Sequence, residues 1–398
     1  MGKDRKGSRT SGQLPIVIFL GFLMVIFAGV MAVLAVTWRD GKVREEKQVQ
    51  ALADAAEPQT APQTEEIAIR TDTEKEEDLK IEEEIRNVSL LFGGDVLLSD
   101  HVLAAYERGG GIQGVLGEGF RNEIGQADVF MVNQEFPFSD RGEQAEDKQF
   151  TFRLPPEKVS MFQEMGIDIV TLANNHALDY GTDALLDSCS VLDGAGILHV
   201  GAGADLEAAK AWETIEVGEK TIGFLGATRV IPVPEWAATQ YQPGMLSTYD
   251  PAVLLEQIAM AKAVCDYVIV YVHWGIERDE FPQEYQKTLG RQYIDAGADL
   301  VIGSHPHVLQ GIEYYQGKPI VYSLGNLVFG SSIPKTMLLK VEWNGEETRL
   351  TAVPGTSSAG YTRELTDQAE RLAFFDYLES ISFGAAIDEG GVIRPQKQ

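Results

Sequence analysis

The chain has 398 residues, of which 44% are hydrophobic and 23% charged, so two or three domains fit its length and its composition excludes a chain that is disordered throughout. Its 33 Lys and Arg residues against 60 Asp and Glu residues give a formal net charge of −27, which would repel a phosphate backbone and argues against nucleic acid as a partner. The two cysteines, Cys189 and Cys265, both lie in apolar segments, so we expect buried free thiols and no disulfide scaffold.

The first predicted element is a transmembrane helix over residues 14–36, which contain no charged side chain. At about 1.5 Å per residue this run spans roughly 34 Å, enough to cross a lipid bilayer core of about 30 Å. The tail before it, residues 1–13, has an excess of basic residues, which favours a cytoplasmic amino end. We therefore expect a single-pass protein of the cell membrane whose C-terminal domain is extracytoplasmic. A cleaved signal peptide is the alternative, although the apolar run is longer than such a peptide needs.

Residues 37–87 follow as an acidic linker, rich in Glu, Gln, Ala and Thr and almost without aromatic residues. Such a composition cannot bury enough apolar surface to order itself, so we expect a disordered spacer.

From residue 88 onward, short apolar runs alternate with helical patterns. The runs predict strands over 88–92, 129–132, 167–172, 222–225, 267–272, 300–302 and 320–323. The patterns between them predict helices over 155–165, 183–195, 251–263 and 282–296. This order indicates an α/β fold whose strands are covered by helices on both sides. We assign residues 88–345 to one domain and 346–398 to a C-terminal extension, with a hairpin over 337–353 and a closing helix over 365–381.

Polar side chains follow five of the predicted strands at the point where each strand ends. They are Asp95 after the first, Asn133 and Glu135 after the second, Asn174, Asn175 and His176 after the third, His273 after YVIVYV, and His305 and His307 after DLVIGS. Ligands of open α/β sheets bind beyond the carboxyl ends of the strands, so these residues are expected at one edge. Carboxylate, amide and imidazole groups together suit Mn²⁺, Fe²⁺ or Zn²⁺, as one ion or as two that share a bridging carboxylate.

Each of these residues has a structural explanation when taken alone. Asp95 could cap a helix or form a turn, the two asparagines could form turns, and His273 could be a buried imidazole with ordinary partners. His101 and His199 lie away from the strand ends and receive no role. The number of strand ends that carry such residues is what favours a metal site.

Several segments resemble the CapA-type poly-γ-glutamate capsule biosynthesis proteins, a branch of the calcineurin-like metallophosphoesterase superfamily. They are LFGGDVLL, VNQEFPFSD, DIVTLANNHALDYG, VIVYVHWGIE and DLVIGSHPHVLQGIEYYQGKPIVYSLGNLVF, which occur in the family's order over residues 88–341. The resemblance implies a calcineurin-like metallophosphoesterase-type α/β sandwich with a site for one or two divalent metal ions.

The resemblance also implies a role for each residue. Asp95 and His307 would bind one metal, Asn175, His273 and His305 would bind the other, and Glu135 would bridge the two. His176 would be the general acid near the leaving group.

The chain departs from the superfamily pattern at two positions. Leu97 stands where an imidazole is usual, and Glu135 replaces an aspartate as the bridge. Asn133, Asp179 and Asn326 are the candidates to replace the missing ligand, and a single-metal centre is the alternative.

Two functions remain open at this point. The first is a metal-dependent hydrolase or transferase that acts on phosphoesters or on amide bonds of an anionic polymer. The second is a non-catalytic subunit that binds poly-γ-glutamate and works with capsule synthase membrane subunits. Arg153, Arg229, Arg278 and Lys335 lie near the motifs and are the candidates to bind substrate carboxylates or phosphates.

Overall fold

The computed structural model describes residues 87–146 and 148–396, which belong to one unit, Ile85–Gln398. The predicted basic tail (1–13), transmembrane helix (14–36) and linker up to residue 86 lie outside the described residues. None of the helices that the structure describes is long and apolar enough to cross a membrane.

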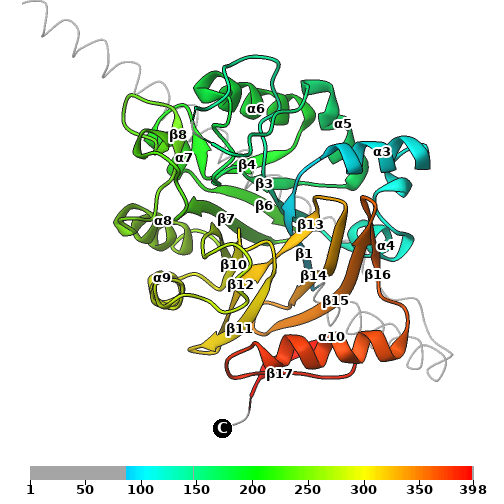
Figure 1. Cartoon of the computed structure of the whole chain (residues 1–398). Coiled ribbons are helices and arrows are strands. Elements are labelled where there is room, and N and C mark those ends of the chain that lie inside the picture. Colours follow the sequence, from blue (N-terminus) through cyan, green and yellow to red (C-terminus); the bar gives the residue numbers. More distant parts are fainter. Residues whose placement is uncertain (1–86, 147, 397–398) are drawn as a thin grey trace, which may run out of the picture. The chain divides into compact units, whose positions relative to one another are not determined.

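The first of two large sheets contains the amino-terminal strands of the domain (Figure 1). Its strands run in the order β17-β18-β15-β14-β1-β2-β3-β4, with β13 paired to β1 and β16 to β15. Strands β1 to β4 and β13 pair parallel with one another, whereas β14 is antiparallel to β1 and the other C-terminal strands pair antiparallel. The bounds are β1 Val88–Val96, β2 Val129–Gln134, β3 Ile169–Thr171, β4 Leu198–Val200, β13 Asn326–Val328, β14 Ser332–Trp343, β15 Thr348–Ser358, β16 Tyr361–Glu364, β17 Ala385–Ile387 and β18 Val392–Pro395.

The second large sheet has the order β11-β12-β10-β9-β7-β6. Its four central strands are parallel, and the two edge strands are antiparallel to their neighbours. The bounds are β6 Glu213–Val217, β7 Lys220–Thr228, β9 Tyr267–His273, β10 Leu300–Ser304, β11 Leu309–Tyr315 and β12 Lys318–Leu324. The short strands β5 (Ala202–Gly203) and β8 (Gly244–Met245) form a separate pair.

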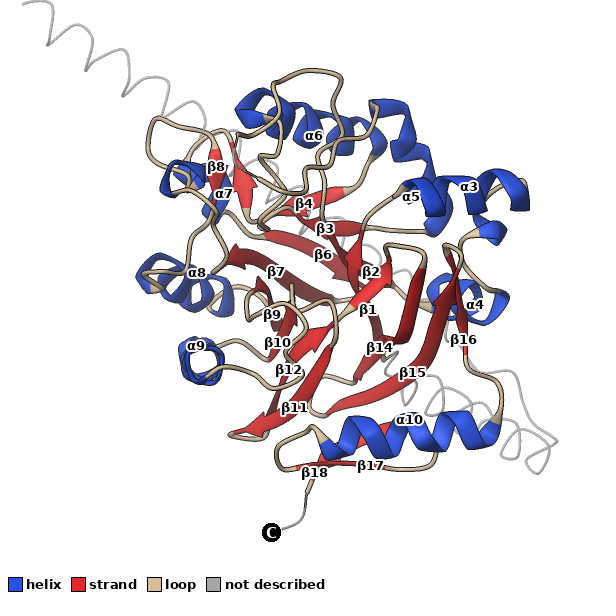
Figure 2. Ribbon diagram, viewed as in Figure 1, coloured by secondary structure: helices blue, strands red, loops and turns tan. Residues whose placement is uncertain are grey.

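The two large sheets pack face to face, and helices cover their outer faces (Figure 2). The helices are α3 Asp100–Gly109, α4 Glu118–Gln126, α5 Val159–Met165, α6 Gly181–Ala195, α7 Leu206–Lys210, α8 Ala252–Lys262, α9 Glu284–Ala296 and α10 Gln368–Ser380. Helices α3 to α6 pack on the first sheet, α8 and α9 pack on the second, and α10 contributes to the core between the sheets.

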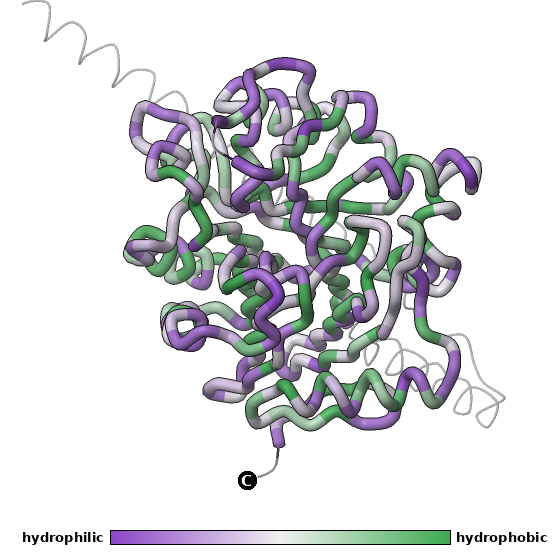
Figure 3. Tube along the Cα trace, viewed as in Figure 1, coloured by the Kyte–Doolittle hydropathy of each residue, from purple (hydrophilic) through white to green (hydrophobic). Residues whose placement is uncertain are grey.

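Successive side chains along each strand alternate between the core between the sheets and the helix-covered outer face. In β1, Leu90 and Phe92 lie in the core between the sheets, whereas Leu91 faces the helices. In β9, Ile269 and Tyr271 likewise face inward and Val270 faces outward. Successive side chains of a strand point to opposite faces, so a strand buried on both faces is apolar throughout its length. In Figure 3 apolar segments run along these strands, and many of the connecting loops are hydrophilic.

The mixed α/β prediction is confirmed, and every predicted strand and helix from residue 88 onward is present with small shifts at its ends. The residue pattern did not predict that the strands divide into two sheets. Residues 346–398 form strands β15 to β18, which belong to the first sheet, and helix α10.

Candidate metal centre

The polar residues predicted at strand ends gather at one place, where both sheets end. Asp95 and Glu135 come from the first sheet, from β1 and from the residue after β2. His273 ends β9, and His305 follows β10 in the second sheet. All four side chains are at most 5% exposed. The parallel central strands of both sheets thus bring carboxylates and imidazoles to a shared edge.

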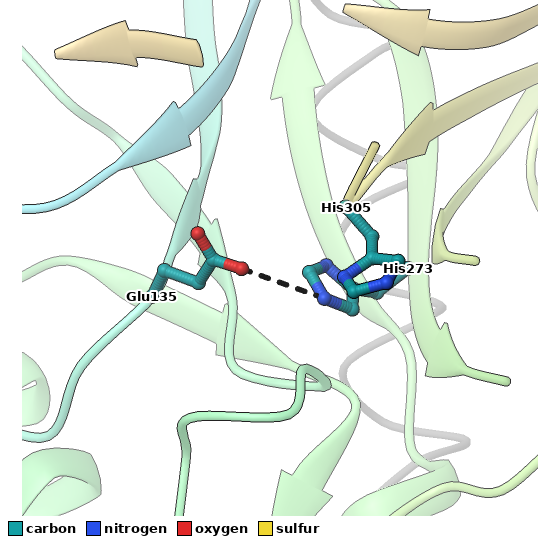
Figure 4. Close-up of side chains that lie close together, drawn as sticks. All are labelled: Glu135, His273 and His305. Atoms are coloured by element: carbon teal, nitrogen blue, oxygen red, sulfur yellow. Dashed lines mark ion pairs between the residues drawn. The ribbon is translucent and has the colours of Figure 1, made fainter. Parts of the chain in front are cut away.

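Two groups of ligand atoms share one residue, Glu135. In the first group Glu135, His273 and His305, and in the second Asp95, Glu135 and His307, each residue offers one atom within 4.8 Å of the others. Figure 4 shows the Glu135 carboxylate facing the His273 ring, with Oε1 3.5 Å from Nε2. The other carboxylate oxygen, Oε2, lies 3.8 Å from Nδ1 of His307. The Glu135 carboxylate therefore lies between two sets of ligand atoms.

The Glu135 carboxylate is fully buried, and neither of its oxygens has a hydrogen-bond partner among the described residues. Burial raises its pKa well above the ordinary value, the negative charge of Asp95 raises it further, and His307 opposes the shift. Nδ1 of His305 is also buried without a partner there. A buried carboxylate costs free energy unless a counter-charge, hydrogen bonds or a metal ion compensates it. The unpartnered Glu135 oxygens and His305 Nδ1 are therefore suited to bind a divalent cation.

Asp95 is held in place from three sides. Its Oδ1 accepts a hydrogen bond from Nδ2 of Asn133 at 2.8 Å, and its Oδ2 accepts from the backbone N–H of His305 at 3.3 Å. Nδ1 of His307 lies 3.2 Å from the same Oδ2. Gly94 precedes Asp95 because the backbone passes very close to Gly325 here, and a Cβ at Gly94 would lie 1.8 Å from the Gly325 carbonyl oxygen. The Gly-Gly-Asp motif thus fixes the carboxylate at the strand end.

His273 has partners on both ring nitrogens. Nε2 lies 2.8 Å from Oδ1 of Asn175, and Nδ1 lies 3.1 Å from Oγ of Ser304. Burial lowers the pKa of His273 well below its ordinary value, and the neighbouring His305 lowers it further. A neutral imidazole is the form that ligates metals, so this environment suits a ligand.

His305 and His307 adopt backbone conformations that non-glycine residues rarely use, with φ of 96° and 58°. Such conformations cost about 1 to 3 kcal/mol each and persist where the surroundings enforce them. Burial and the nearby His307 lower the pKa of His305 to about 4. Burial alone would lower the pKa of His307 too, but the carboxylates of Glu135 and Asp95 raise it to about 10.

His176 belongs to a neighbouring cluster with Asp179 and Lys148. Its Nδ1 lies 2.7 Å from Oδ2 of Asp179 and 3.1 Å from Nζ of Lys148. The lysine also donates to Oδ1 of Asp179 and to the backbone carbonyl of Asn175. The Phe152 ring packs against His176, with 4.5 Å between the centroids. Burial lowers the pKa of both His176 and Lys148.

Sequence reasoning missed Lys148. It lies in a loop without secondary structure, and its side chain is 15% exposed. Its one signal in the sequence is that it is a single lysine in the acidic stretch GEQAEDKQF.

The three candidates for the missing ligand have different positions. Oδ1 of Asn326 lies 2.8 Å from Nδ1 of His307, and Asn133 contacts Asp95, so both border the second group. Asp179 contacts His176 and Lys148 and belongs to neither group. Leu97 is 4% exposed and belongs to the apolar core between the first sheet and its helices.

The four predicted substrate-binding cations have different surroundings, and only Arg229 and Arg278 contact the backbone of the ligand-bearing segments. Arg229 follows β7, and its backbone N–H donates to the His273 carbonyl at 2.8 Å. Arg278 is exposed, and its backbone N–H donates to the carbonyl of Pro306, between the two histidines. The Arg153 guanidinium donates to the Arg141 and Gly142 carbonyls in its own loop. Nζ of Lys335 lies 3.8 Å from the centroid of the Tyr377 ring on α10.

The remaining predictions concern residues without a role. His101 is exposed in α3, and His199 pairs with Asp193 at 3.3 Å, so neither joins the metal groups. Cys189 and Cys265 are free thiols, as expected; Cys265 is buried, whereas Cys189 is half-buried.

Comparison with known proteins places this site in a family. The family described as "Bacterial capsule synthesis protein PGA_cap" matches residues 89–331. The PGA biosynthesis protein CapA of Bacillus subtilis is 39% identical over 191 residues, which are 48% of this chain and 50% of that protein. A probable polyglutamine synthesis accessory protein of Mycobacterium tuberculosis is 36% identical over 210 residues, 50% of this chain and 55% of the relative. The chain thus spans about half the length of these curated relatives.

Among solved structures, a putative 5'-nucleotidase from Staphylococcus aureus aligns with a TM-score of 0.43 and 16% sequence identity. The alignment covers 74% of this chain and 58% of that one.

Proposed function

The chain belongs to the bacterial capsule synthesis protein family PGA_cap, and on that premise we propose that it acts in poly-γ-glutamate capsule synthesis as a metal-dependent hydrolase or transferase. The single observation that supports this most is the buried Glu135 carboxylate between two sets of ligand atoms. We further propose that residues 14–36 anchor the protein in the cell membrane, with the domain from residue 88 onward on the extracytoplasmic side.

The proposed metal-binding residues combine the two groups of ligand atoms with the neighbouring Asn175. Asn175, His273 and His305 would hold one ion, Asp95 and His307 would hold the other, and Glu135 would bind both. This mixture of carboxylate, amide and imidazole groups suits Mn²⁺, Fe²⁺ or Zn²⁺. Bound divalent ions supply Lewis-acid stabilisation of negative charge on a phosphoryl or carbonyl oxygen.

His176 supplies the proton chemistry. Its Nδ1–H donates to Oδ2 of Asp179, which orients the ring and leaves Nε2 to accept a proton and to pass it to a leaving nitrogen or oxygen. Lys148 holds Asp179 from the other side and is a positioning residue for this pair. Phe152 packs on the imidazole ring and shields it from water.

A second candidate function is that of a non-catalytic accessory subunit. It is favoured by the name of the mycobacterial relative and by Leu97, whose side chain lies in the apolar core where it supplies no ligand. In this role the metal centre would bind carboxylates of the polymer without turnover, beside the membrane subunits of a capsule synthase.

One experiment separates the two. The full-length protein is loaded with Mn²⁺ and incubated with γ-linked glutamate oligomers and with a generic phosphodiester. The hydrolase proposal predicts turnover that His176→Ala lowers by at least about 100-fold, since general acid–base catalysis contributes about 10²- to 10⁴-fold. Metal content should stay unchanged in this variant, and His199→Ala is the control histidine. Metal-dependent oligomer binding without turnover would reject the hydrolase and support the accessory subunit.

A further inference from the structure

We propose that Arg229 and the cavity around it form a carboxylate-binding subsite beside the metal centre, which holds the free α-carboxylate of a γ-linked glutamate unit. This inference rests on the proposed function, because it assumes that the polymer binds at this edge of the sheets. In a γ-linked chain the side-chain carboxyl forms the amide, so each unit presents one free carboxylate beside the bond that would be cleaved.

The position of Arg229 follows from the register of the second sheet. Thr228, the last residue of β7, pairs with His273, the last residue of β9. Arg229 comes next, and its backbone N–H donates to the carbonyl of His273. Thr228 and His273 share one face of the sheet, so the Arg229 side chain starts toward the opposite face, where its guanidinium meets Tyr285 at the start of α9. A polymer that passes over the rim of the second sheet, from the metal centre to its helix-covered face, would therefore reach Arg229.

A cavity of about 280 Å³ lies at this position. Its lining includes Arg229, the segment Val230–Pro232, Tyr249, Gly275 and Tyr285. Gly275 lies two residues after His273, and its backbone N–H donates to the hydroxyl of Tyr285 at 2.7 Å. This hydrogen bond connects Tyr285, in the wall of the cavity, to the loop that follows His273.

Two aromatic rings hold the Arg229 guanidinium. Its central carbon lies 4.0 Å from the ring centroid of Tyr249 and 5.4 Å from that of Tyr285. Stacking on aromatic faces fixes the plane of a guanidinium while its edge remains available for hydrogen bonds. Tyr249 is 61% exposed, so the stack reaches the surface where a polymer could enter.

The charge of Arg229 has no carboxylate partner among residues 87–146 and 148–396. Its side chain makes one long hydrogen bond there, from Nη1 to the Thr248 carbonyl at 3.5 Å. By contrast, Arg141, Arg291 and Arg371 each pair with a carboxylate. In a chain with a net charge of −27, a stacked arginine without such a partner is prepared for an incoming carboxylate, which it can bind through two parallel N–H···O bonds.

The test measures binding of γ-linked glutamate oligomers to the full-length, Mn²⁺-loaded protein by calorimetry. Oligomers whose α-carboxylates are methyl esters serve as the uncharged ligand. Arg349→Gln is the matched control, because Arg349 lies on β15 and reaches Glu342 only at 3.9 Å. Thermal unfolding of each variant verifies that it is folded.

We expect Arg229→Gln to weaken binding of the free-acid oligomer at least about tenfold, since a charge-assisted bidentate pair is lost. Parent and variant should bind the ester equally weakly, and Arg349→Gln should match the parent. Arg229→Lys keeps the charge but loses the planar fork, so it should also bind more weakly than the parent. It provides the test if the glutamine variant does not fold.

Arg229 variants that bind the free acid as tightly as the parent would overturn the subsite and leave the proposed function standing. A parent protein that binds neither oligomer would overturn the proposed function, and the subsite with it.

Discussion

Glu135→Gln should make the metal-free protein more stable and the metal-loaded protein less stable than the parent. The substitution keeps the size of the side chain and removes its charge. In the metal-free parent this charge is fully buried beside Asp95, and neither carboxylate oxygen has a hydrogen-bond partner among the described residues. An amide at the same place carries no charge to desolvate and does not repel Asp95.

The magnitude follows from the difference between a buried charge and a buried neutral amide, since neither has hydrogen-bond partners here. A neutral polar group without partners costs about 1 to 3 kcal/mol and a charged group costs more, but the amide also loses the attraction between Glu135 and His307. We therefore expect the free energy of unfolding to rise by only about 1 kcal/mol in EDTA. When metal is present, a ligand at 100 times its dissociation constant stabilises the parent by about 2.7 kcal/mol. The variant lacks the shared ligand and gains little, so the order of the two proteins should reverse.

The assay is urea unfolding of both proteins in EDTA and in excess Mn²⁺. Glu313→Gln is the matched control, because Glu313 is also buried but accepts hydrogen bonds from Arg291 at 2.8 Å and from Tyr322 at 2.5 Å. The Glu313→Gln substitution should destabilise the protein in both EDTA and Mn²⁺, because these hydrogen bonds lose their charged acceptor. A Glu135→Gln protein that is less stable than the parent in EDTA and gains as much from Mn²⁺ as the parent does would contradict this prediction.

Three further predictions follow from the site and its surroundings. Leu97→His should lower stability by about 1 to 3 kcal/mol without adding bound metal, because the side chain lies in an apolar core, and a rise in metal content by elemental analysis would contradict this. Lys148→Met should destabilise the protein by roughly 3 kcal/mol, because the buried Asp179 carboxylate loses its cation, and Asp179→Asn in the same chain should recover part of that loss in a double-mutant cycle. A cycle without coupling would show that the pair does not interact. Burial raises the pKa of the Cys189 thiol to about 12, so the thiolate is scarce at pH 8, and alkylation should be at least about 100-fold slower than for free cysteine, whose pKa is about 8.5. A rate close to that of free cysteine would contradict the burial.

Strand positions could be predicted from the sequence because the apolar runs are short and end at polar residues. Asp95, Glu135, His273 and His305 were assigned for this reason, and the structure brings all four together at the shared edge of the two sheets. The pattern could not reveal how many sheets the strands form. Strands of a sandwich covered by helices are buried on both faces, and so are strands of one sheet between two helical layers, so their hydropathy is the same.

Lys148 could not be predicted because its position depends on how a loop without periodic pattern folds back over the strand ends. The same holds for the aromatic stack on Arg229, since Tyr249 and Tyr285 are far from Arg229 in the sequence and reach it only through tertiary structure. The place of Asn326 beside His307 likewise depends on the pairing of β13 with β1. These contacts belong to tertiary packing, which residue spacing does not encode.

The most direct test of the account is the metal stoichiometry of the full-length protein at saturating Mn²⁺ or Zn²⁺. Two sets of ligands that share Glu135 predict two ions per chain in the parent. His305→Ala and His307→Ala should each lower the content by one ion, because each removes an imidazole from a different set, and His199→Ala should change nothing. Two ions retained in both ligand variants, or none bound by the parent, would contradict the assignment of this site as a metal centre.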